Sequence, residues 1–508
     1  MQRRAFVESG TKREEAAGSS AARGQDAATG TAAPLTLHSA ADFYRTKPVL
    51  DRRVHILGVG NVGSFIAHSI RGIPNPPPVT LLFPSWDRLN AWQDSEQRLS
   101  LVTEGDTETR SGYDAELAIP RIRYHGKEVG LTSAAEGDSA ILEGELSAPI
   151  SSLIVCSKAP VVLQALSAVK HRLTRDSVIL FLQNGMGIVD EVSREIFPDP
   201  AMRPYYMLGV NSHGVHSTPD TPFTTVHAGF GTLSLGILPH ERDRDPASPY
   251  APRDRIRPHS RAQAVQHSPQ PPGTQETDVA LPTSASVPWT PNQRYLLRTL
   301  LRTPVLAATA FSPPDLLQMQ LEKLAVNCII NPLTVLLDAR NGSILYNYAL
   351  TRTMRLLLAE ISLVMRSLPE LQYIPNVDSR FDPGRLETLV VSVAQKTKDN
   401  VSSMLADARA GRQTEIEYIN GWIVRRGEEL GIRCVLNYAV KELVKGKVQM
   451  IDLELGEGVP FVGDGKSGRK DGGLEVRRGV AEKEKPDGRK RAGGTKEKHV
   501  DGEQKAKL

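Results

Sequence analysis

Residues 54–70 read VHILGVGNVGSFIAHSI, and this stretch decides the fold of the first part of the chain. It opens with an apolar run typical of a buried strand and continues with residues that suit a helix. Between the two lie three glycines in G-x-G-x-x-G spacing. In this context the first glycine permits a tight turn, the second lets the backbone approach a pyrophosphate, and the third lets the helix pack closely on the strand. With a purely structural turn as the alternative, the stretch predicts a dinucleotide-binding turn made by Gly58, Val59, Gly60, Asn61, Val62 and Gly63.

Outward from this stretch, apolar runs alternate with helical stretches as far as residue 310. The runs that favour strands are 54–60, 79–83, 152–157, 178–183, 205–210, 233–237 and 305–310. Such alternation predicts a parallel sheet with helices on its faces. From residue 314 to residue 447 the strand signals stop and long helical patterns take over. The predicted fold class is therefore an α/β Rossmann-type N-terminal domain followed by an all-α C-terminal domain.

Composition separates three segments from these two domains. Residues 1–45, 239–292 and 451–508 are rich in Pro, Gly, Ser or charged residues, so we expect them to be disordered. This leaves a dinucleotide-binding domain at 46–312, interrupted by 239–292, and a helical substrate-binding and catalytic domain at 313–450. The charges of the C-terminal tail are mixed in sign, which favours a solvated extension over a nucleic-acid-binding arm.

The bulk composition excludes several classes of protein. A formal net charge of +4 over 508 residues gives no strong field that would favour nucleic acid or a membrane surface. No apolar run approaches the ~18 residues needed to span a bilayer. The three cysteines are widely spaced in apolar runs, which indicates reduced core thiols and no metal site. Because the N-terminus lacks a signal-peptide core and carries acids that presequences avoid, we expect a cytoplasmic protein, with a mitochondrial one as the alternative.

The end of the second strand, VTLLFPSWDRL at 79–89, bears on the choice of nicotinamide cofactor. An NAD enzyme usually places Asp or Glu there to bind the ribose 2′-hydroxyl. Here the first acid is Asp87, whereas Ser85 and Arg88 could meet a 2′-phosphate. We therefore predict NADPH, and an ordinary surface position for Arg88 stays open as the alternative.

Lys158 and Asn184 each follow a predicted strand. Ligands of open α/β sheets bind at the carboxyl ends of strands, so both residues are candidates for the site. A solvated loop position for Lys158 and a turn position beside glycines for Asn184 are the alternatives. His213, in GVNSHGV, is a weaker candidate because a single histidine is more often structural.

The helical segment EKLAVNCIINPLT, residues 322–334, carries an unusual polar stripe. Lys323, Asn327 and Asn331 are spaced by four residues and therefore stack on one face of an otherwise apolar helix. Burying an unpaired polar group costs about 1–3 kcal/mol. The stripe must therefore face either solvent or a binding site.

A second group of candidates lies in DNVSSMLADARAGRQTEIEYINGWIV. The spacing predicts that Asn400 and Ser403 lie at i and i+3 on a helix. Glu415 opens the next apolar helix, where a capping role is the alternative to a role in the site.

These motifs resemble those of the ketopantoate reductase family, also called 2-dehydropantoate 2-reductases. The resemblance covers residues 53–238 and 293–447 and rests on GVGNVGS, SKAPVV, QNGMG, KLAVNCIINPLT, ARNGSIL and NVSSMLADARAGRQTEIEYINGW. It implies an NADPH-dependent reduction of 2-dehydropantoate to (R)-pantoate, a step toward pantothenate and coenzyme A.

The resemblance also implies roles for single residues. The family's catalytic lysine falls on Lys323 and its catalytic-site carboxylate, which contacts the substrate, on Glu415. Its nicotinamide-side lysine and asparagine fall on Lys158 and Asn184. Its substrate-binding residues fall on Asn327, Asn331, Asn341, Asn400 and Ser403. One departure is Pro84, which stands where the family often has a basic residue for the 2′-phosphate.

Two other functions compete with this interpretation. One is a reductase of another small 2-keto or 3-hydroxy acid, and the other is a catalytically silent NADP-binding regulator. The presence of both Lys323 and Glu415 argues against the regulator. We expect a small-molecule substrate, no nucleic-acid or membrane partner and no metal, and a homodimer stays open.

Overall fold

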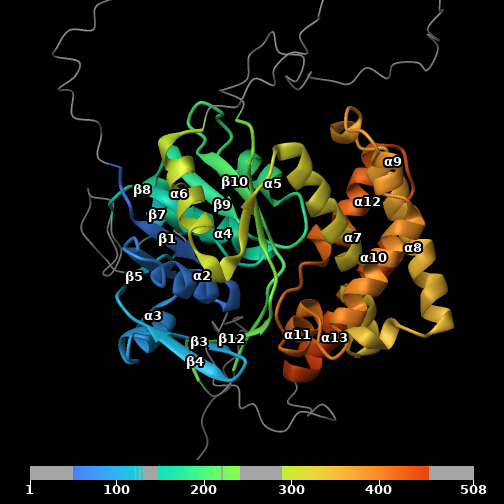
Figure 1. Cartoon of the computed structure of the whole chain (residues 1–508), viewed down its shortest axis with the longest axis horizontal. Coiled ribbons are helices and arrows are strands. Elements are labelled where there is room, and N and C mark those ends of the chain that lie inside the picture. Colours follow the sequence, from blue (N-terminus) through green and yellow to red (C-terminus); the bar gives the residue numbers. More distant parts are fainter. Residues whose placement is uncertain are drawn as a thin grey trace, which may run out of the picture. The chain divides into compact units, whose positions relative to one another are not determined.

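The computed structural model describes residues 50–119, 122–124, 127–129, 147–218, 221–240 and 289–456 (Figure 1). The predicted N-terminal tail, nearly all of the predicted insertion at 239–292 and the C-terminal tail beyond residue 456 lie outside these ranges. The chain divides into two units, 1–448 and 449–508. The first unit contains the sheets and helices that build the candidate site. Within the described ranges no helix has the length and apolar character required to cross a bilayer.

The α/β part is built on an eight-stranded sheet with the order β14-β13-β10-β9-β8-β1-β2-β5. Its strands are β1 (Val54–Leu57), β2 (Val79–Phe83), β5 (Tyr113–Leu117), β8 (Ile150–Val155), β9 (Leu173–Phe181), β10 (Tyr205–Asn211), β13 (Leu233–Ile237) and β14 (Ala308–Ala310). Strands β5 to β10 in this order pair in parallel. The direction of the strand order reverses at β1 and β8, so their carboxyl ends flank the position where such sheets bind ligands.

Each predicted strand run overlaps a strand of this sheet, but the sheet is not wholly parallel. Strand β13 runs antiparallel to β10, because the chain turns back after β10 instead of crossing over through a helix. Strand β5 of this sheet was not predicted, and neither were six short strands outside it. These form a four-stranded sheet of β11 (Gly214–Ser217), β12 (Thr224–Gly229), β3 (Leu99–Thr103) and β4 (Asp106–Arg110), and a hairpin of β6 (Ile122–Tyr124) and β7 (Lys127–Val129). Strand β4 reads DTETR and is almost fully exposed, so no apolar pattern marks it.

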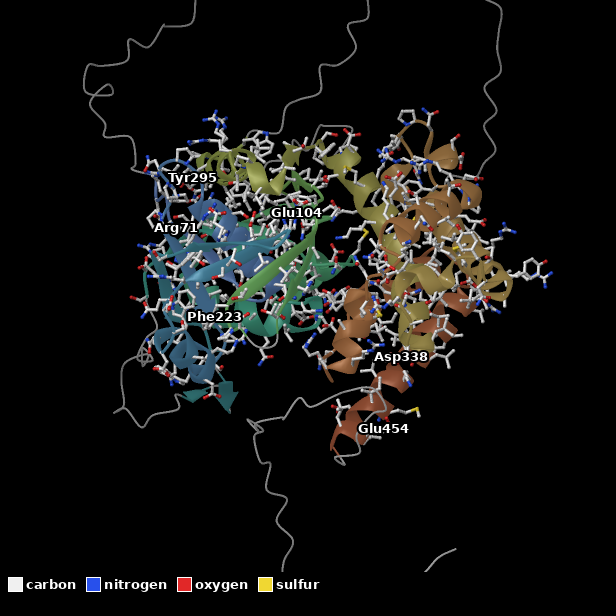
Figure 2. All side chains as sticks on the ribbon, turned by 60° about the horizontal axis from the view of Figure 1, so that its bottom comes forward. Arg71, Glu104, Phe223, Tyr295, Asp338 and Glu454 are labelled. Atoms are coloured by element: carbon white, nitrogen blue, oxygen red, sulfur yellow. The ribbon has the colours of Figure 1, made fainter. Side chains whose placement is uncertain are left out.

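Helices cover both faces of the large sheet. One core cluster includes the apolar faces of α2 (Asn61–Arg71) and α6 (Pro291–Leu301), and a second includes those of α4 (Val162–Val169) and α5 (Ile188–Glu195). Figure 1 shows α2 and α6 over the near face of the sheet. In Figure 2 the labelled Tyr295 marks α6, and its hydroxyl donates to the Arg52 carbonyl over 2.8 Å, which ties α6 to the chain entering β1. Helix α3 (Trp86–Gln93) follows β2.

Helix α6 begins inside the segment that we predicted to be disordered up to residue 292. Thr290 and Gln293 form a capping box, in which the Thr290 side chain accepts from the Gln293 N–H and the Gln293 side chain accepts from the Thr290 N–H. This reciprocal pair satisfies two backbone donors at the helix start and fixes it at this point. The insertion boundary at residue 292 was therefore placed a few residues too late.

The all-helical part predicted for the second half of the chain is confirmed. Its longest helix, α7 (Pro313–Leu337), packs against α8 (Tyr348–Arg366), α10 (Pro383–Lys396) and α11 (Ser403–Arg409). The remaining elements are α9 (Val377–Arg380), α12 (Asn420–Glu429), α13 (Val435–Gly456) and the 3₁₀ turns η5 (Asn341–Ile344), η6 (Pro369–Leu371) and η7 (Ile416–Tyr418). Asp338 ends α7 in the left-handed conformation and pairs with Arg409 of α11 over 2.9 Å (Figure 2).

Helix α13 runs to Gly456, past residue 450, where the sequence analysis ended the helical domain. The helical spacing of apolar residues continues through Val448 and Ile451, and the first helix-breaking residue after Gly446 is Gly456 itself. Helix α13 therefore extends more than one turn beyond the predicted boundary at residue 450.

Candidate active site

The glycine-rich turn between β1 and α2 has the geometry of a phosphate cradle. Gly58 has φ +97°, and a Cβ there would lie 2.4 Å from the Ser157 backbone nitrogen. A Cβ at Gly63 would lie 2.1 Å from the Gly58 carbonyl oxygen, so both positions require glycine. At Gly60 a Cβ would meet no atom within 4 Å. The N-terminus of α2 has no side-chain cap and no acid in its first turn. Its backbone donors and positive dipole end therefore face open space, which fits a pyrophosphate.

Arg88 lies beside this turn. Ser85 caps α3 by accepting from the Arg88 backbone N–H over 3.4 Å, and this cap sets the start of the helix. The Arg88 guanidinium donates to the Val59 carbonyl, also over 3.4 Å. The arginine side chain is exposed at the end of β2, next to a turn that lacks a carboxylate. These residues can therefore accept the phosphorylated ribose of a dinucleotide.

The carboxyl ends of β8 and β9 are tied together. The Gln183 side-chain amide donates to the Val155 carbonyl over 2.8 Å and to the Ser157 carbonyl over 2.9 Å. Lys158 and Asn184 come directly after these tied ends. The sheet thus brings the two predicted candidates to the same edge as the glycine turn.

Lys323 of α7 reaches this edge from the helical part. Its ammonium donates to the Asn184 side-chain oxygen over 2.9 Å and to the Asn211 carbonyl over 2.6 Å. Burial lowers the pKa of Lys323 from 10.5 to about 8, and the nearby Glu415 carboxylate opposes this fall. Lys323 therefore faces the α/β part, and its pKa of about 8 is well below that of a solvated lysine.

Glu415 completes a chain of hydrogen bonds across the site. Its side chain is buried, with 5% of the residue exposed. One carboxylate oxygen accepts from the Asn184 amide over 3.0 Å, and the other accepts from the Ala159 backbone N–H over 3.2 Å. Asn184 consequently bridges Lys323 and Glu415. Glu415 makes no helix-capping hydrogen bond, so its side chain serves the site.

The turn that carries Asn184 is seated against η7. The Met186 N–H donates to the Tyr418 carbonyl over 2.8 Å. Gly185 has φ +81°, and a Cβ there would lie 2.3 Å from the same carbonyl oxygen. The Tyr418 hydroxyl donates to Glu191 of α5 over 2.8 Å. A close backbone contact that only glycine permits therefore fixes the position of Asn184.

The other candidates on α7 lie on the same helical face as Lys323. Neither the Asn327 nor the Asn331 side chain has a hydrogen-bond partner in the part of the chain that the structure describes. Asn331 is nonetheless buried, with 6% exposed. Asn341 donates through its side chain to Thr397 over 3.0 Å, and its buried side-chain oxygen has no partner. These amides are free to bind a small polar ligand.

The prediction that Asn400 and Ser403 share a helix was wrong. Asn400 precedes α11, where its carbonyl accepts from the Asn341 N–H over 3.0 Å. Ser402 caps the helix, because its hydroxyl accepts from the Leu405 N–H and also contacts the Thr334 hydroxyl over 2.7 Å. Both Asn400 and Ser403 are exposed. The backbone between them leaves the helical path to place the Ser402 hydroxyl in the cap.

His213 is a structural histidine. Its ring nitrogens lie 3.1 Å from His227 and 3.0 Å from the Leu306 carbonyl, inside the α/β part. No contact joins it to Lys323 or Glu415. Among the described residues, no group of three or more His, Cys, Asp or Glu side chains is arranged to hold a metal ion.

Sequence reasoning missed Asp407 and Asn211. Asp407 is buried, with 2% exposed, and binds the Lys158 ammonium and the Arg412 guanidinium. The sequence could have indicated Asp407, since this acidic residue shares the apolar, buried face of α11 with Met404 and Ala408. Asn211 acts through its backbone carbonyl, which no residue pattern can reveal.

A cavity of about 1280 Å³ lies beside the Asn184 turn, but the Lys323–Asn184–Glu415 network does not line it. Gly185, Met186, Leu316 and Trp422 are among its lining residues, whereas Lys323 and Glu415 are not. The candidate site is therefore identified by its polar network and by the edge of the sheet.

Comparison with known proteins identifies the family. The model described as "Ketopantoate reductase PanE/ApbA" matches residues 54–240, and that described as "Ketopantoate reductase PanE/ApbA C terminal" matches residues 315–448. Together they cover more than half of the 508 residues. The chain belongs to the ketopantoate reductase family.

Individual ketopantoate reductase relatives are distant. The Schizosaccharomyces pombe protein named "Probable 2-dehydropantoate 2-reductase" is 26% identical over 78% of this chain and 97% of its own length. The "Ketoisovalerate reductase BEA2" of Gibberella fujikuroi is 25% identical over 74% of this chain and 78% of its own length. The solved PanE/ApbA family ketopantoate reductase from Ralstonia eutropha covers 78% of this chain and 99% of its own, with 18% identity and a TM-score of 0.51. The chain is thus an oxidoreductase of the ketopantoate reductase type.

Proposed function

We propose that this reductase converts 2-dehydropantoate to (R)-pantoate with NADPH, in the cytoplasmic route to pantothenate and coenzyme A. The observation that carries the proposal is the Lys323–Asn184–Glu415 network at the carboxyl edge of the sheet. It places a lysine with a pKa of about 8 and a buried carboxylate within one hydrogen-bonded amide of each other. This pair suits a substrate that carries both a reducible carbonyl and a hydroxyl group.

Lys323 acts on the carbonyl oxygen of the substrate. The reduced nicotinamide, when bound, supplies the hydride that the C2 carbonyl carbon accepts. As negative charge develops on the oxygen, the Lys323 ammonium stabilises it and donates a proton. A pKa of about 8 keeps the lysine mostly protonated at neutral pH and makes its proton easier to release than that of a solvated lysine.

Asn184 and Glu415 orient the reacting groups. Asn184 holds the ammonium through its side-chain oxygen and the carboxylate through its nitrogen, so the two charges keep a fixed relative position. Each carboxylate oxygen of Glu415 accepts one hydrogen bond from the protein and has a lone pair left for a substrate hydroxyl. Positioning of this kind supplies a large part of the rate enhancement of such reductases.

The remaining substrate contacts come from side chains with unused hydrogen-bonding groups. Asn327 and Asn331 extend the polar stripe of α7 beyond Lys323. Asn341 has a buried side-chain oxygen without a partner, and its backbone is bonded to Asn400. Ser403 is exposed at the start of α11. We assign these five residues to the substrate carboxylate and hydroxyl groups.

The cofactor is assigned to the glycine turn and Arg88. The free N-terminus of α2 would hold the pyrophosphate, and the Arg88 guanidinium beside Val59 would pair with a 2′-phosphate. Pro84 offers no charge, so Arg88 takes the part that a basic residue directly after β2 plays elsewhere in the family. Lys158 and Asn184 would then lie on the nicotinamide side of the bound cofactor.

The test compares substrates that differ by the hydroxyl group that Glu415 would bind. Purified protein is assayed for NADPH oxidation with 2-dehydropantoate, 2-ketoisovalerate and pyruvate. A site built to bind a hydroxyl rejects analogues that lack it, so kcat/KM should favour 2-dehydropantoate over 2-ketoisovalerate by about a hundredfold or more. Equal or higher kcat/KM with 2-ketoisovalerate would instead assign the chain to the activity named for its Gibberella relative.

A further inference from the structure

Two carboxylates of the helical part bind consecutive residues at the end of β8. Asp407 of α11 binds the Lys158 ammonium, and Glu415 accepts from the Ala159 backbone N–H over 3.2 Å. Lys158 and Ala159 begin the 3₁₀ turn η1 (Ala159–Val161), which follows the central strand β8 and leads into α4. The two contacts therefore hold the same short segment, Lys158 and Ala159, against the helical part.

Contacts with Arg412 hold Asp407 in place independently of Lys158. Its second carboxylate oxygen accepts from the Arg412 guanidinium over 3.1 Å, and its carbonyl accepts from the Arg412 N–H over 2.9 Å. Only 4% of the Asp407 side chain is exposed, against 40% of the Lys158 side chain. The carboxylate is thus the fixed partner, and the lysine is the partner whose position depends on the contact.

We propose that Asp407 is a positioning residue of the reaction and acts through Lys158. By binding Lys158, Asp407 fixes the start of the 3₁₀ turn η1 and orients the Ala159 N–H toward Glu415. Glu415 in turn sets Asn184 and Lys323. The inference rests on the proposed function, because it assumes that this network performs the reduction.

The central experiment is a double-variant comparison of Asp407→Asn and Lys158→Met. Asparagine keeps the shape of aspartate but loses the charge that holds the lysine. Loss of a hydrogen bond between charged groups usually changes an equilibrium or rate about tenfold or more. Because Lys158 is partly exposed, we expect Asp407→Asn to lower kcat/KM by about tenfold. In the Lys158→Met background, Asp407→Asn should cost nothing further, and the division of the loss between kcat and KM should match that of Lys158→Met.

A matched control removes a different ion pair on the same helix. Asp338 pairs with Arg409 of α11 over 2.9 Å and has no contact with Lys158. Asp338 has φ +48°, a conformation that asparagine tolerates well, so Asp338→Asn preserves the backbone. This control should keep kcat/KM within about twofold, since an exposed ion pair contributes little.

Two outcomes overturn the inference. Equal losses from Asp407→Asn in the wild-type and Lys158→Met backgrounds would mean that Asp407 acts independently of the lysine. No loss in the wild-type background would mean that it positions nothing. If Asp407→Asn does not fold, Lys158→Gln decides, because its amide can still donate to a carboxylate. Higher kcat/KM for Lys158→Gln than for Lys158→Met supports the inference, and equal values overturn it.

Hydrogen exchange separates this inference from the proposed function. Loss of the Asp407 contact should speed amide exchange in the peptide that contains Ala159, and Asp338→Asn should leave it unchanged. This measurement needs no turnover. An inactive wild type with the expected exchange pattern would refute the proposed reaction alone, whereas an active wild type whose Ala159 peptide is unaffected by Asp407→Asn would refute the positioning role.

Discussion

Replacing Lys323 with methionine should abolish most activity and change how stability depends on pH. Burial lowers the pKa of this lysine from 10.5 to about 8. One pKa unit corresponds to about 1.36 kcal/mol, so holding the charged lysine in the fold costs about 3 kcal/mol. Methionine fills a similar volume without the charge, although the Asn184 and Asn211 oxygens lose their donor. Kinetically, loss of one donor to a developing oxyanion should lower kcat/KM by about a hundredfold to a thousandfold.

The sign of the pH effect follows from proton binding. In the folded protein the lysine loses its proton near pH 8, whereas the unfolded chain keeps it up to about pH 10.5. Between these values the unfolded state binds more protons, so the free energy of unfolding of the wild type rises with pH. The methionine variant lacks this contribution. The stability of the wild type relative to the variant should therefore rise by about 3 kcal/mol from neutral pH to pH 10.5.

The assay is urea unfolding of both proteins at a series of pH values, with kcat/KM measured on the same preparations. Other titrating groups are common to both proteins and cancel in the difference. Lys396→Met, at an exposed position in the last turn of α10, is the matched control and should show a pH-independent difference from the wild type. If the stability difference between the wild type and Lys323→Met is also independent of pH, the claim that burial lowers the pKa of Lys323 is refuted. Turnover within tenfold of the wild type would refute its catalytic role.

Three further predictions concern Glu415, Gly185 and Arg88. Because Glu415 raises the pKa of Lys323, Glu415→Gln should move the alkaline fall of the kcat/KM profile to lower pH, and an unchanged alkaline limb would contradict this electrostatic coupling. Gly185→Ala should reduce activity and Tm more than Gly431→Ala, since both glycines have positive φ but only the first would place its Cβ against a backbone oxygen, so equal effects would argue against the close approach. Arg88→Ala should raise KM for NADPH by up to about fivefold and leave KM for NADH unchanged, because an exposed ion pair is worth about 0–1 kcal/mol; a strong NADPH preference that survives the change would place the phosphate contact elsewhere.

The fold was predictable where local pattern and burial agree. The glycine turn at 54–70 and the buried central strands carry continuous apolar runs, and the predicted α/β and all-helical parts are confirmed. The polar strand β4 and the antiparallel direction of β13 were not predictable, since both depend on backbone pairing with a neighbouring strand. The start of α6 at residue 291 depends on a capping box, which the composition of the preceding segment obscured.

The sequence by itself determined which residues are candidates for the site. A lysine followed by asparagines four and eight residues later on an apolar helix predicts a polar face, because side chains at that spacing lie on the same side of a helix. Likewise, Lys158 and Asn184 were candidates because they end strands. Such reasoning reaches only neighbours in the chain or in one element.

Only the tertiary structure decided how these residues meet. Lys323 and Asn184 are 139 positions apart, and Lys158 and Asp407 are 249 apart. Their contacts depend on how α7, α11 and η7 pack on the edge of the sheet, and in particular on the glycine contact that seats the Asn184 turn. The lowered pKa of Lys323 arises from the same packing, since burial is a property of the assembled fold and leaves no trace in the local sequence.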